Sequence, residues 1–312
     1  MNPAFSVIVL TTLIGAGQGL VLGLFVVEAR AAAELLEAPS ATLYGAGCGV
    51  ALLLLAAGLL ASFFHLGHPE RAWRAAAMWR TSWLSREVIV LPAFMAAVAA
   101  YGWAHWQGWS GTLWIGGAAA LLALALFLCT AMIYACIRFL QEWATPLTLV
   151  NFTLLGCASG VVLLTALAAA MGEPLVEVVG AWALGLTVAG LVTRSAALWR
   201  NARLKPRSTL QTAIGVKHPR VVQKAQGFMG GSFNTREFFH GRGPGTLRAV
   251  KWLFIVAGFV LPVLLLAGGL AASSPQLLWL AVLMQFAGLM AERWFFFAQA
   301  NHPQNLYYQA VS

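Results

Sequence analysis

The chain has 312 residues, of which 60% are hydrophobic and only 9% are charged. A soluble domain of this length has about a quarter of its residues charged, so an ordinary water-facing surface is excluded. The apolar residues also form long runs, such as Leu113 to Ile137, and a helix that crosses the bilayer core needs about 20 of them. The composition therefore predicts an all-α integral membrane protein.

Eight apolar segments are long enough to be predicted as transmembrane helices. They lie near residues 6–27, 42–64, 86–106, 111–137, 147–171, 175–198, 250–271 and 275–298. An even number of helices places both termini on the same side of the membrane, together with the loops after the second, fourth and sixth helices. We expect residues 1–312 to form a single membrane domain, with its helices grouped as two four-helix bundles.

The distribution of basic residues tests this helix count. Of the 19 Lys and Arg residues, 18 fall on the side of the termini and only Arg30 falls on the other side. Because basic residues are retained in the cytoplasm, we expect both termini and the loops at about 65–85 and 201–248 to be cytoplasmic, in a bacterial inner membrane. The net charge of +9 is explained by this topology and by contact with anionic lipid, and it leaves no folded soluble surface for nucleic acid.

The most informative segment joins the second and third predicted helices. It reads Phe64-His-Leu-Gly-His-Pro-Glu-Arg-Ala-Trp-Arg74, followed by Trp79-Arg-Thr-Ser-Trp-Leu-Ser-Arg-Glu87. A quinone site needs such a mixture: an apolar slot, hydrogen-bond donors for two carbonyls and a group that exchanges protons. His65 is of a residue type that supplies or takes protons near neutral pH, and Glu87 is a candidate for relaying a proton. The candidate quinone-binding residues are His65, Glu87, Arg86, Arg74, Ser82, Trp83 and Gln18.

A structural interpretation of the same residues stays open. A glutamate near the start of a helix is favoured by the helix dipole, here with Ser85 as a candidate N-cap. His65 can lie in the lipid headgroup layer, and the arginines can serve only to orient the protein.

Further polar residues lie inside the predicted helices, where such groups often mark function. They include Gln18, Asn151, Glu177, Gln285 and the pair Glu292-Arg293, most of them near helix ends. Gln18 is the deepest, and it either faces a ligand or forms an interhelical hydrogen bond.

We expect no metal centre and no catalytic residue in this chain. A transmembrane b-type haem needs two histidines at similar depth on facing helices, whereas His65 and His105 end their helices on opposite sides, roughly 30 Å apart. The other histidines lie in loops or in the tail. The four cysteines lie singly in apolar spans without a CxxC pair, so ligands for an iron–sulfur cluster or for zinc are missing.

The loop at 201–248 is longer than a connection requires. It carries several phenylalanines among basic residues, whereas disordered linkers are poor in aromatics. We therefore expect an ordered surface that binds a partner protein. The candidate docking residues are Phe228, Phe233, Arg236, Phe238 and Phe239.

The chain resembles the membrane anchor subunits of the dimethyl sulfoxide reductase type. The resemblance is carried by the segments His65–Arg74 and Thr81–Glu87, and by Trp143-Ala-Thr-Pro-Leu-Thr at the start of the fifth predicted helix. Two later segments, Gly230–His240 and Glu292–Phe297, resemble the sulfite dehydrogenase branch of that family.

The resemblance implies an anchor subunit without a redox metal of its own. Such a subunit exchanges electrons between quinone, either ubiquinone or menaquinone, and the ferredoxin-like iron–sulfur subunit of a complex whose catalytic subunit holds molybdopterin. It associates the quinone pocket with His65 and Glu87, and the basic cytoplasmic side favours sulfite oxidation in the cytoplasm. Three alternatives stay open: a quinol-oxidising anchor of the dimethyl sulfoxide reductase type, an anchor that binds partners but not quinone, and a membrane transporter.

Overall fold

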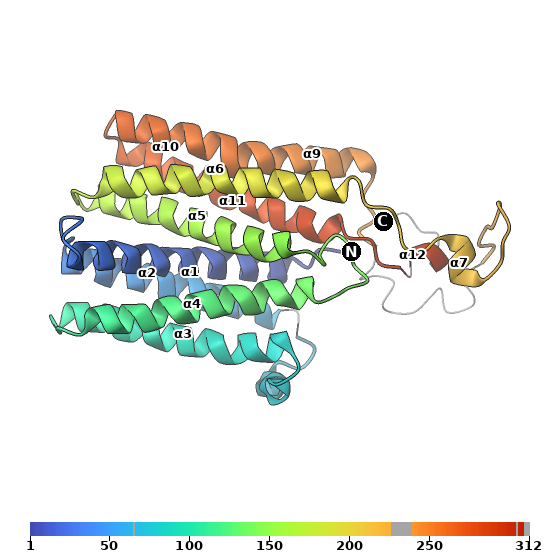
Figure 1. The fold of residues 1–312 in the computed structure, drawn as a ribbon, viewed down its shortest axis with the longest axis horizontal. Helices are drawn as coiled ribbons and strands as arrows, with labels where there is room; N and C mark the ends of the chain where they lie inside the picture. Colours follow the sequence, from blue (N-terminus) through green and yellow to red (C-terminus); the bar gives the residue numbers. More distant parts are fainter. Residues whose placement is uncertain (65, 226–238, 304, 309–312) are drawn as a thin grey trace.

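The computed structural model of the protein describes residues 1–64, 66–225, 239–303 and 305–308. Within these ranges eight helices are long and apolar enough to cross a membrane, and they lie side by side (Figure 1). They are α1 (Phe5–Ala32), α2 (Ala41–Phe63), α3 (Trp83–Trp106), α4 (Thr112–Ala135), α5 (Pro146–Ala170), α6 (Val176–Asn201), the continuous series α9 (Pro244–Ile255), η2 (Val256–Val260) and α10 (Leu261–Ala271), and α11 (Pro275–Ala298). The predicted all-α fold with eight membrane-spanning helices is confirmed.

Helix α3 begins at Trp83, three residues before its predicted start. The side chain of Ser82 accepts a hydrogen bond from the backbone N–H of Ser85 and so caps the helix. The assignment of Ser85 as a candidate N-cap was wrong, because Ser85 already lies in the first turn. Glu87 consequently lies in the second turn, beyond the first turn in which a helix dipole acts strongly.

Helix α1 packs against α5, α2, α4 and α11, so it is the central helix of the molecule. Its glycines allow a very close approach to α5: a Cβ atom on Gly19 would lie 2.1 Å from the carbonyl oxygen of Gly156, and one on Gly160 would lie 2.1 Å from the backbone nitrogen of Leu20. Small residues at a helix interface let two helix backbones approach each other closely in lipid.

The helix contacts form two rings. One ring runs through α1, α2, α3 and α4, and the other runs through α5, α6, α10 and α11. However, α1 packs as extensively against α5 of the second ring as against α2 of its own. The division into two four-helix bundles therefore stays a prediction.

The short elements gather at one end of the helices. The amino terminus, the 3₁₀ helix η1 (Pro69–Met78), α7 (Leu210–Ile214) and α12 (Asn305–Tyr308) all lie there (Figure 1). We call this end the terminal end. It is also where α3 begins and where α2, α4 and α6 finish, as an even number of helices requires.

Candidate functional site

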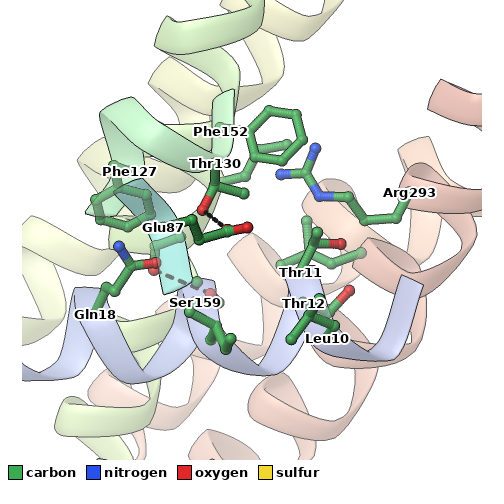
Figure 2. Close-up of a pocket in the computed structure, with 15 residues that line it drawn as sticks. Leu10, Thr11, Thr12, Gln18, Glu87, Phe127, Thr130, Phe152, Ser159 and Arg293 are labelled. Carbon is green, nitrogen blue, oxygen red and sulfur yellow. Dashed lines mark hydrogen bonds between the residues drawn. The ribbon is translucent and has the colours of Figure 1, made fainter. Parts of the chain in front are cut away.

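A small cavity lies between α1, α3, α4, α5 and α11, in the half of these helices that faces the terminal end (Figure 2). The volume that the centre of a water molecule can occupy in this cavity is about 20 Å³. One water needs roughly 10–15 Å³ by this measure, so the cavity has room for about one water. Its polar lining consists of Thr11, Thr12, Gln18, Glu87, Thr130, Ser159 and Arg293. Apolar side chains, among them Leu10, Phe127, Phe152 and Leu289, close it.

Glu87 supplies the carboxylate of this cavity. The hydroxyl of Thr130, on α4, donates a hydrogen bond to Glu87 Oε1. A carboxylate has about four acceptor positions, so Glu87 retains the capacity to bind a water molecule or a ligand group. Figure 2 shows its carboxylate among the polar side chains of the cavity, with Thr130 on one side.

Gln18 lies on α1 beside the same cavity. Its side chain is 2% exposed, and its Nε2 donates to the carbonyl oxygen of Ala123 on α4 at 2.9 Å. The sequence left open whether Gln18 faces a ligand or joins two helices. The structure shows that it joins α1 to α4 and lines the cavity as well.

Arg293 borders the cavity from α11 and belongs to a buried ion cluster. Its Nη1 lies 3.4 Å from Glu292 Oε2, and Glu292 Oε1 lies 2.6 Å from Nε of Arg194 on α6. The Arg293 guanidinium also stacks over the ring of Phe152, with Cζ 3.8 Å from the ring centroid. The three ionised groups are at most 4% exposed. Both arginines pair with Glu292, and buried charges need such pairing.

This cluster has two positive charges and one negative charge. The net charge of the three groups is thus +1, and the carboxyl group of Glu87 lies in the adjoining cavity. A buried positive charge is felt strongly where the dielectric constant is low. The arrangement therefore favours negative charge in the cavity, either on Glu87 or on a bound ligand.

Comparison with known proteins agrees with this architecture. The family described as "DMSO reductase anchor subunit (DmsC)" matches residues 1–308. The chain is also 58% identical to a sulfite dehydrogenase subunit of Allochromatium vinosum, over 325 aligned positions that cover all of both chains. The chain belongs to the DMSO reductase anchor subunit family. It is thus a membrane anchor of an oxidoreductase complex, as the resemblance in its sequence indicated.

Four of the predicted quinone-binding residues of this anchor subunit lie outside the cavity lining. Arg86 stacks over Trp83, with Cζ 4.2 Å from the ring centroid, and it donates to the carbonyl oxygens of Trp79 and Arg80 at 2.9 and 2.8 Å. Ser82 caps α3. These contacts fasten the end of the loop onto α3.

Arg74, the fourth of these residues, belongs to η1. Its Cζ lies 5.5 Å from the centroid of the Trp73 ring, and both side chains are exposed. Of the seven predicted residues, the structure thus brings Glu87 and Gln18 together at the cavity.

Several predicted residues lie outside the described part of the chain. They are His65 of the quinone site and Phe228, Phe233, Arg236 and Phe238 of the docking surface. Phe239, the fifth docking residue, is described and half-buried.

Arg293, Arg194 and Thr130 were not selected from the sequence as site residues. A signal for Arg293 existed, because the pair Glu292-Arg293 interrupts an apolar span and charged residues within the membrane are costly. Thr130 carried no signal, since a threonine in an apolar helix commonly bonds to its own helix. Its role depends on the position of α3 beside α4.

The opposite end of the helices holds another carboxylate, the buried Glu28 on α1. Tyr101 donates to Glu28 Oε2 at 2.6 Å, and His105 Nε2 lies 3.4 Å from Oε1. The ring of Tyr44 stacks on His105, with centroids 3.8 Å apart. This cluster connects α1, α2 and α3.

Metal ligands do not gather in the described residues: no three His, Cys, Asp or Glu side chains there are placed to hold an ion. The expected absence of haem and of an iron–sulfur cluster stays a prediction. A reduced-minus-oxidised spectrum of the purified anchor protein tests it.

Proposed function

We propose that this anchor subunit exchanges electrons between an iron–sulfur protein and the membrane quinone pool, and that the complex oxidises sulfite in the cytoplasm. The observation that carries the proposal is the Glu87 cavity, where an acid–base group, hydrogen-bonding side chains and a buried cation meet inside the membrane domain. The relative from Allochromatium vinosum, named as part of a sulfite dehydrogenase, supports the choice of sulfite.

The donor set of the cavity suits a quinone headgroup. Quinone supplies the redox chemistry when bound, since it takes up two electrons and two protons to give quinol. Glu87 is the group that exchanges a proton, and general acid–base groups of this kind contribute about 10² to 10⁴ in rate. Arg293 favours the negative charge that electron arrival brings.

The cavity must open before a ring can enter. Its present volume holds about one water, so apolar side chains such as Leu10 and Phe127 have to move aside. His65 follows the end of α2 at Phe63 by two residues. By its place in the family resemblance, we assign it as donor to one quinone carbonyl.

The decisive experiment separates quinone chemistry from assembly. In the purified complex, Glu87→Gln keeps the size and hydrogen bonding of the side chain but removes its ionisable proton, and His65→Ala removes the proposed donor. Both variants are expected to lower quinone-linked turnover strongly, while electron transfer from the soluble subunits to an artificial acceptor persists. Normal quinone turnover in both assembled variants would contradict the proposal.

The terminal end is proposed to face the cytoplasm, because 18 of the 19 basic residues belong to that side. Reporter fusions at the carboxyl terminus are expected to be active in the cytoplasm. A reporter that is active only outside the cytoplasm would reverse the orientation and, with it, the side on which partners bind.

The loop between α6 and α9 is proposed to bind the ferredoxin-like iron–sulfur subunit, which in turn carries the molybdopterin subunit. Aromatic and arginine side chains are enriched at protein interfaces, and this loop holds both. Deletion of residues 228–239 is expected to release the soluble subunits from membranes that retain the anchor. If the complex stays intact, docking occurs elsewhere.

A quinol-oxidising role is the second candidate, favoured by the description of the matching family as an anchor of DMSO reductase. The same site would then work in the opposite direction, with Glu87 accepting a proton from quinol. Steady-state assays of the complex with sulfite and quinone, and with quinol and dimethyl sulfoxide, distinguish the two directions.

A further inference from the structure

A second small cavity adjoins the Glu87 cavity on the side of the terminal end. Phe152 and Arg293 line both cavities, and Asn151, Arg194 and Glu292 line the second one. About 10 Å³ of the second cavity is open to the centre of a water molecule. This volume lies at the lower limit for one water.

Several polar atoms that line the second cavity lack partners. Among the residues that the structure describes, Asn151 Oδ1, Arg194 Nη2 and Gln299 Nε2 are buried and make no hydrogen bond. Asn151 is 5% exposed and Arg194 is 2% exposed, so bulk solvent does not reach them. Buried polar groups are costly to leave unpaired, and ordered water is the usual partner in a space of this size.

The second cavity in turn adjoins a groove at the surface of the terminal end. About 640 Å³ of this groove is open to the centre of a water molecule, and the segments after α4 and α6 and the segment before α12 line it. Glu142 and Asn201 line both the groove and the second cavity. Three separate spaces that share lining residues therefore lie in series between the surface and Glu87, with the ion cluster beside them.

We propose that these spaces form a hydrated passage that carries protons between the groove at the terminal end and Glu87. The inference rests on the proposed function, in which one quinone, two electrons and two protons give one quinol. The iron–sulfur partner supplies the electrons, and the aqueous phase at the groove supplies the protons. Each proton moves along water molecules past Asn151 to Glu87. Glu87 passes the proton to a carbonyl oxygen of the quinone and returns to its starting protonation state.

The ion cluster sets when protons enter this passage. Its net charge of +1, from Arg194, Arg293 and Glu292, opposes an excess proton as long as the cavity holds no added negative charge. Two electrons on the quinone add negative charge that attracts the proton and outweighs this repulsion. Proton entry thus follows electron arrival, and the passage does not leak protons at rest.

The hydration of the passage is tested in the wild-type complex by X-ray radiolytic labelling, which modifies side chains that contact water. Phe152 and Phe296 line the second cavity and are 4% and 5% exposed. We expect them to be labelled several-fold faster than Phe94 and Phe259, which are 0% and 1% exposed and line none of the three spaces. Equal, slow labelling of all four rings would show a dry interior and overturn the proposal.

Proton transfer is tested with Asn151→Leu, which keeps the branching of the side chain and removes its polar atoms from the lining. We expect quinone-linked turnover to fall roughly tenfold to 100-fold and the solvent isotope effect in D₂O to rise, because proton supply becomes rate-limiting. The matched control is Thr165→Val on the same helix, since Thr165 is buried and donates to Val161 of its own helix at 2.8 Å. Turnover and isotope effect are expected to stay unchanged in the control.

Binding of a short-chain ubiquinone analogue separates this inference from the proposed function. Asn151→Leu is expected to bind the analogue with wild-type affinity. Wild-type turnover and isotope effect in Asn151→Leu, with normal binding, would overturn the passage alone. Absence of analogue binding to the wild-type complex would overturn the proposed function. If Asn151→Leu does not assemble, Gln299→Leu serves as the second variant, with the same expected outcomes.

Discussion

Two carboxylates, the half-buried Glu87 and the buried Glu28, lie toward opposite ends of the helices in contrasting surroundings. Glu28 accepts a hydrogen bond from Tyr101 at 2.6 Å and pairs with His105 at 3.4 Å, and the ring of Tyr44 covers His105. Glu87 accepts from Thr130 and borders a cavity that also contains the edge of a buried ion cluster.

The difference separates a structural carboxylate from a site. A buried carboxylate gains its stability from the donors around it, and the Glu28 partners Tyr101 and His105 both lie on α3. Tyr44 of α2 stacks on His105, so Glu28 is explained by holding α1 to this part of α3. Glu87 has unused acceptor positions beside an open space, which is what a group that binds and exchanges protons requires. Three experiments test this contrast, and a fourth concerns the groove at the terminal end.

The largest effect is expected from Gly160→Ala, which disturbs both ends at once. The added Cβ would lie 2.1 Å from the backbone nitrogen of Leu20, so α1, which carries both Gln18 and Glu28, has to move away from α5. Overpacking typically costs about 1–3 kcal/mol, and more where backbone is struck. We expect loss of the folded anchor from membranes, measured by thermal stability in detergent. Gly49→Ala, where the new Cβ meets no atom within 4 Å, is the control and is expected to fold normally.

Arg293→Met is expected to affect the Glu87 end only. The variant keeps apolar packing against Phe152 and leaves the pair Arg194–Glu292, whose charges then balance. Loss of a preorganised group that stabilises developing charge typically costs about 10² to 10³ in rate, and we expect quinone-linked turnover to fall by this factor with the complex assembled. Unchanged turnover would mean that the ion cluster is structural, like the Glu28 cluster.

Tyr101→Phe tests the structural end by removing a single hydroxyl. Glu28 then loses the hydrogen bond at 2.6 Å, and leaving a buried acceptor without its donor costs about 1–3 kcal/mol. We expect a lower melting temperature of the anchor and an unchanged quinone-linked rate per assembled complex. Thr130→Val is the counterpart at Glu87, with the opposite expectation: a lower rate at similar stability. The same pattern in both variants would remove the distinction between the two carboxylates.

The smallest effect concerns the tail beside the groove. Burial of His302, whose ring meets that of Phe139 at 5.3 Å, lowers its pKa from the ordinary value of 6.5. The tail, residues 301–303 and 305–306, therefore binds a proton more readily when it is detached from the groove than when it packs there. Its packing in the groove is unaffected above pH 6.5 and weakens as the pH falls below this value. The amide hydrogens of Asn305 and Leu306, which donate to the carbonyl oxygens of His302 and Pro303, are expected to lose protection from exchange on the acid side. His302→Phe is expected to abolish this pH dependence.

Two of the seven predicted quinone-binding residues line the cavity. Glu87 was selected from the polar segment before the third predicted helix and from the family resemblance, and Gln18 was selected as the deepest polar residue of its span. Arg86, Trp83 and Ser82 share the same segment but are used in capping and stacking instead. The composition of the segment does not separate these roles. Successive residues at the start of a helix point to different faces of it, so only some of them face the cavity.

The number of membrane-spanning helices and the common end of the termini followed from the sequence, because in lipid every spanning segment must be apolar and must satisfy its own backbone. The close approach of the α1 glycines to Gly156 and Gly160 of α5 was decided by the tertiary structure. The same holds for Thr130 beside Glu87, and for Arg194 beside Glu292, almost 100 residues away along the chain. Lipid imposes a length and a polarity on each helix separately, whereas the identity of its neighbours depends on side-chain packing between helices. The sequence of one helix taken alone therefore does not determine which helices pack beside it.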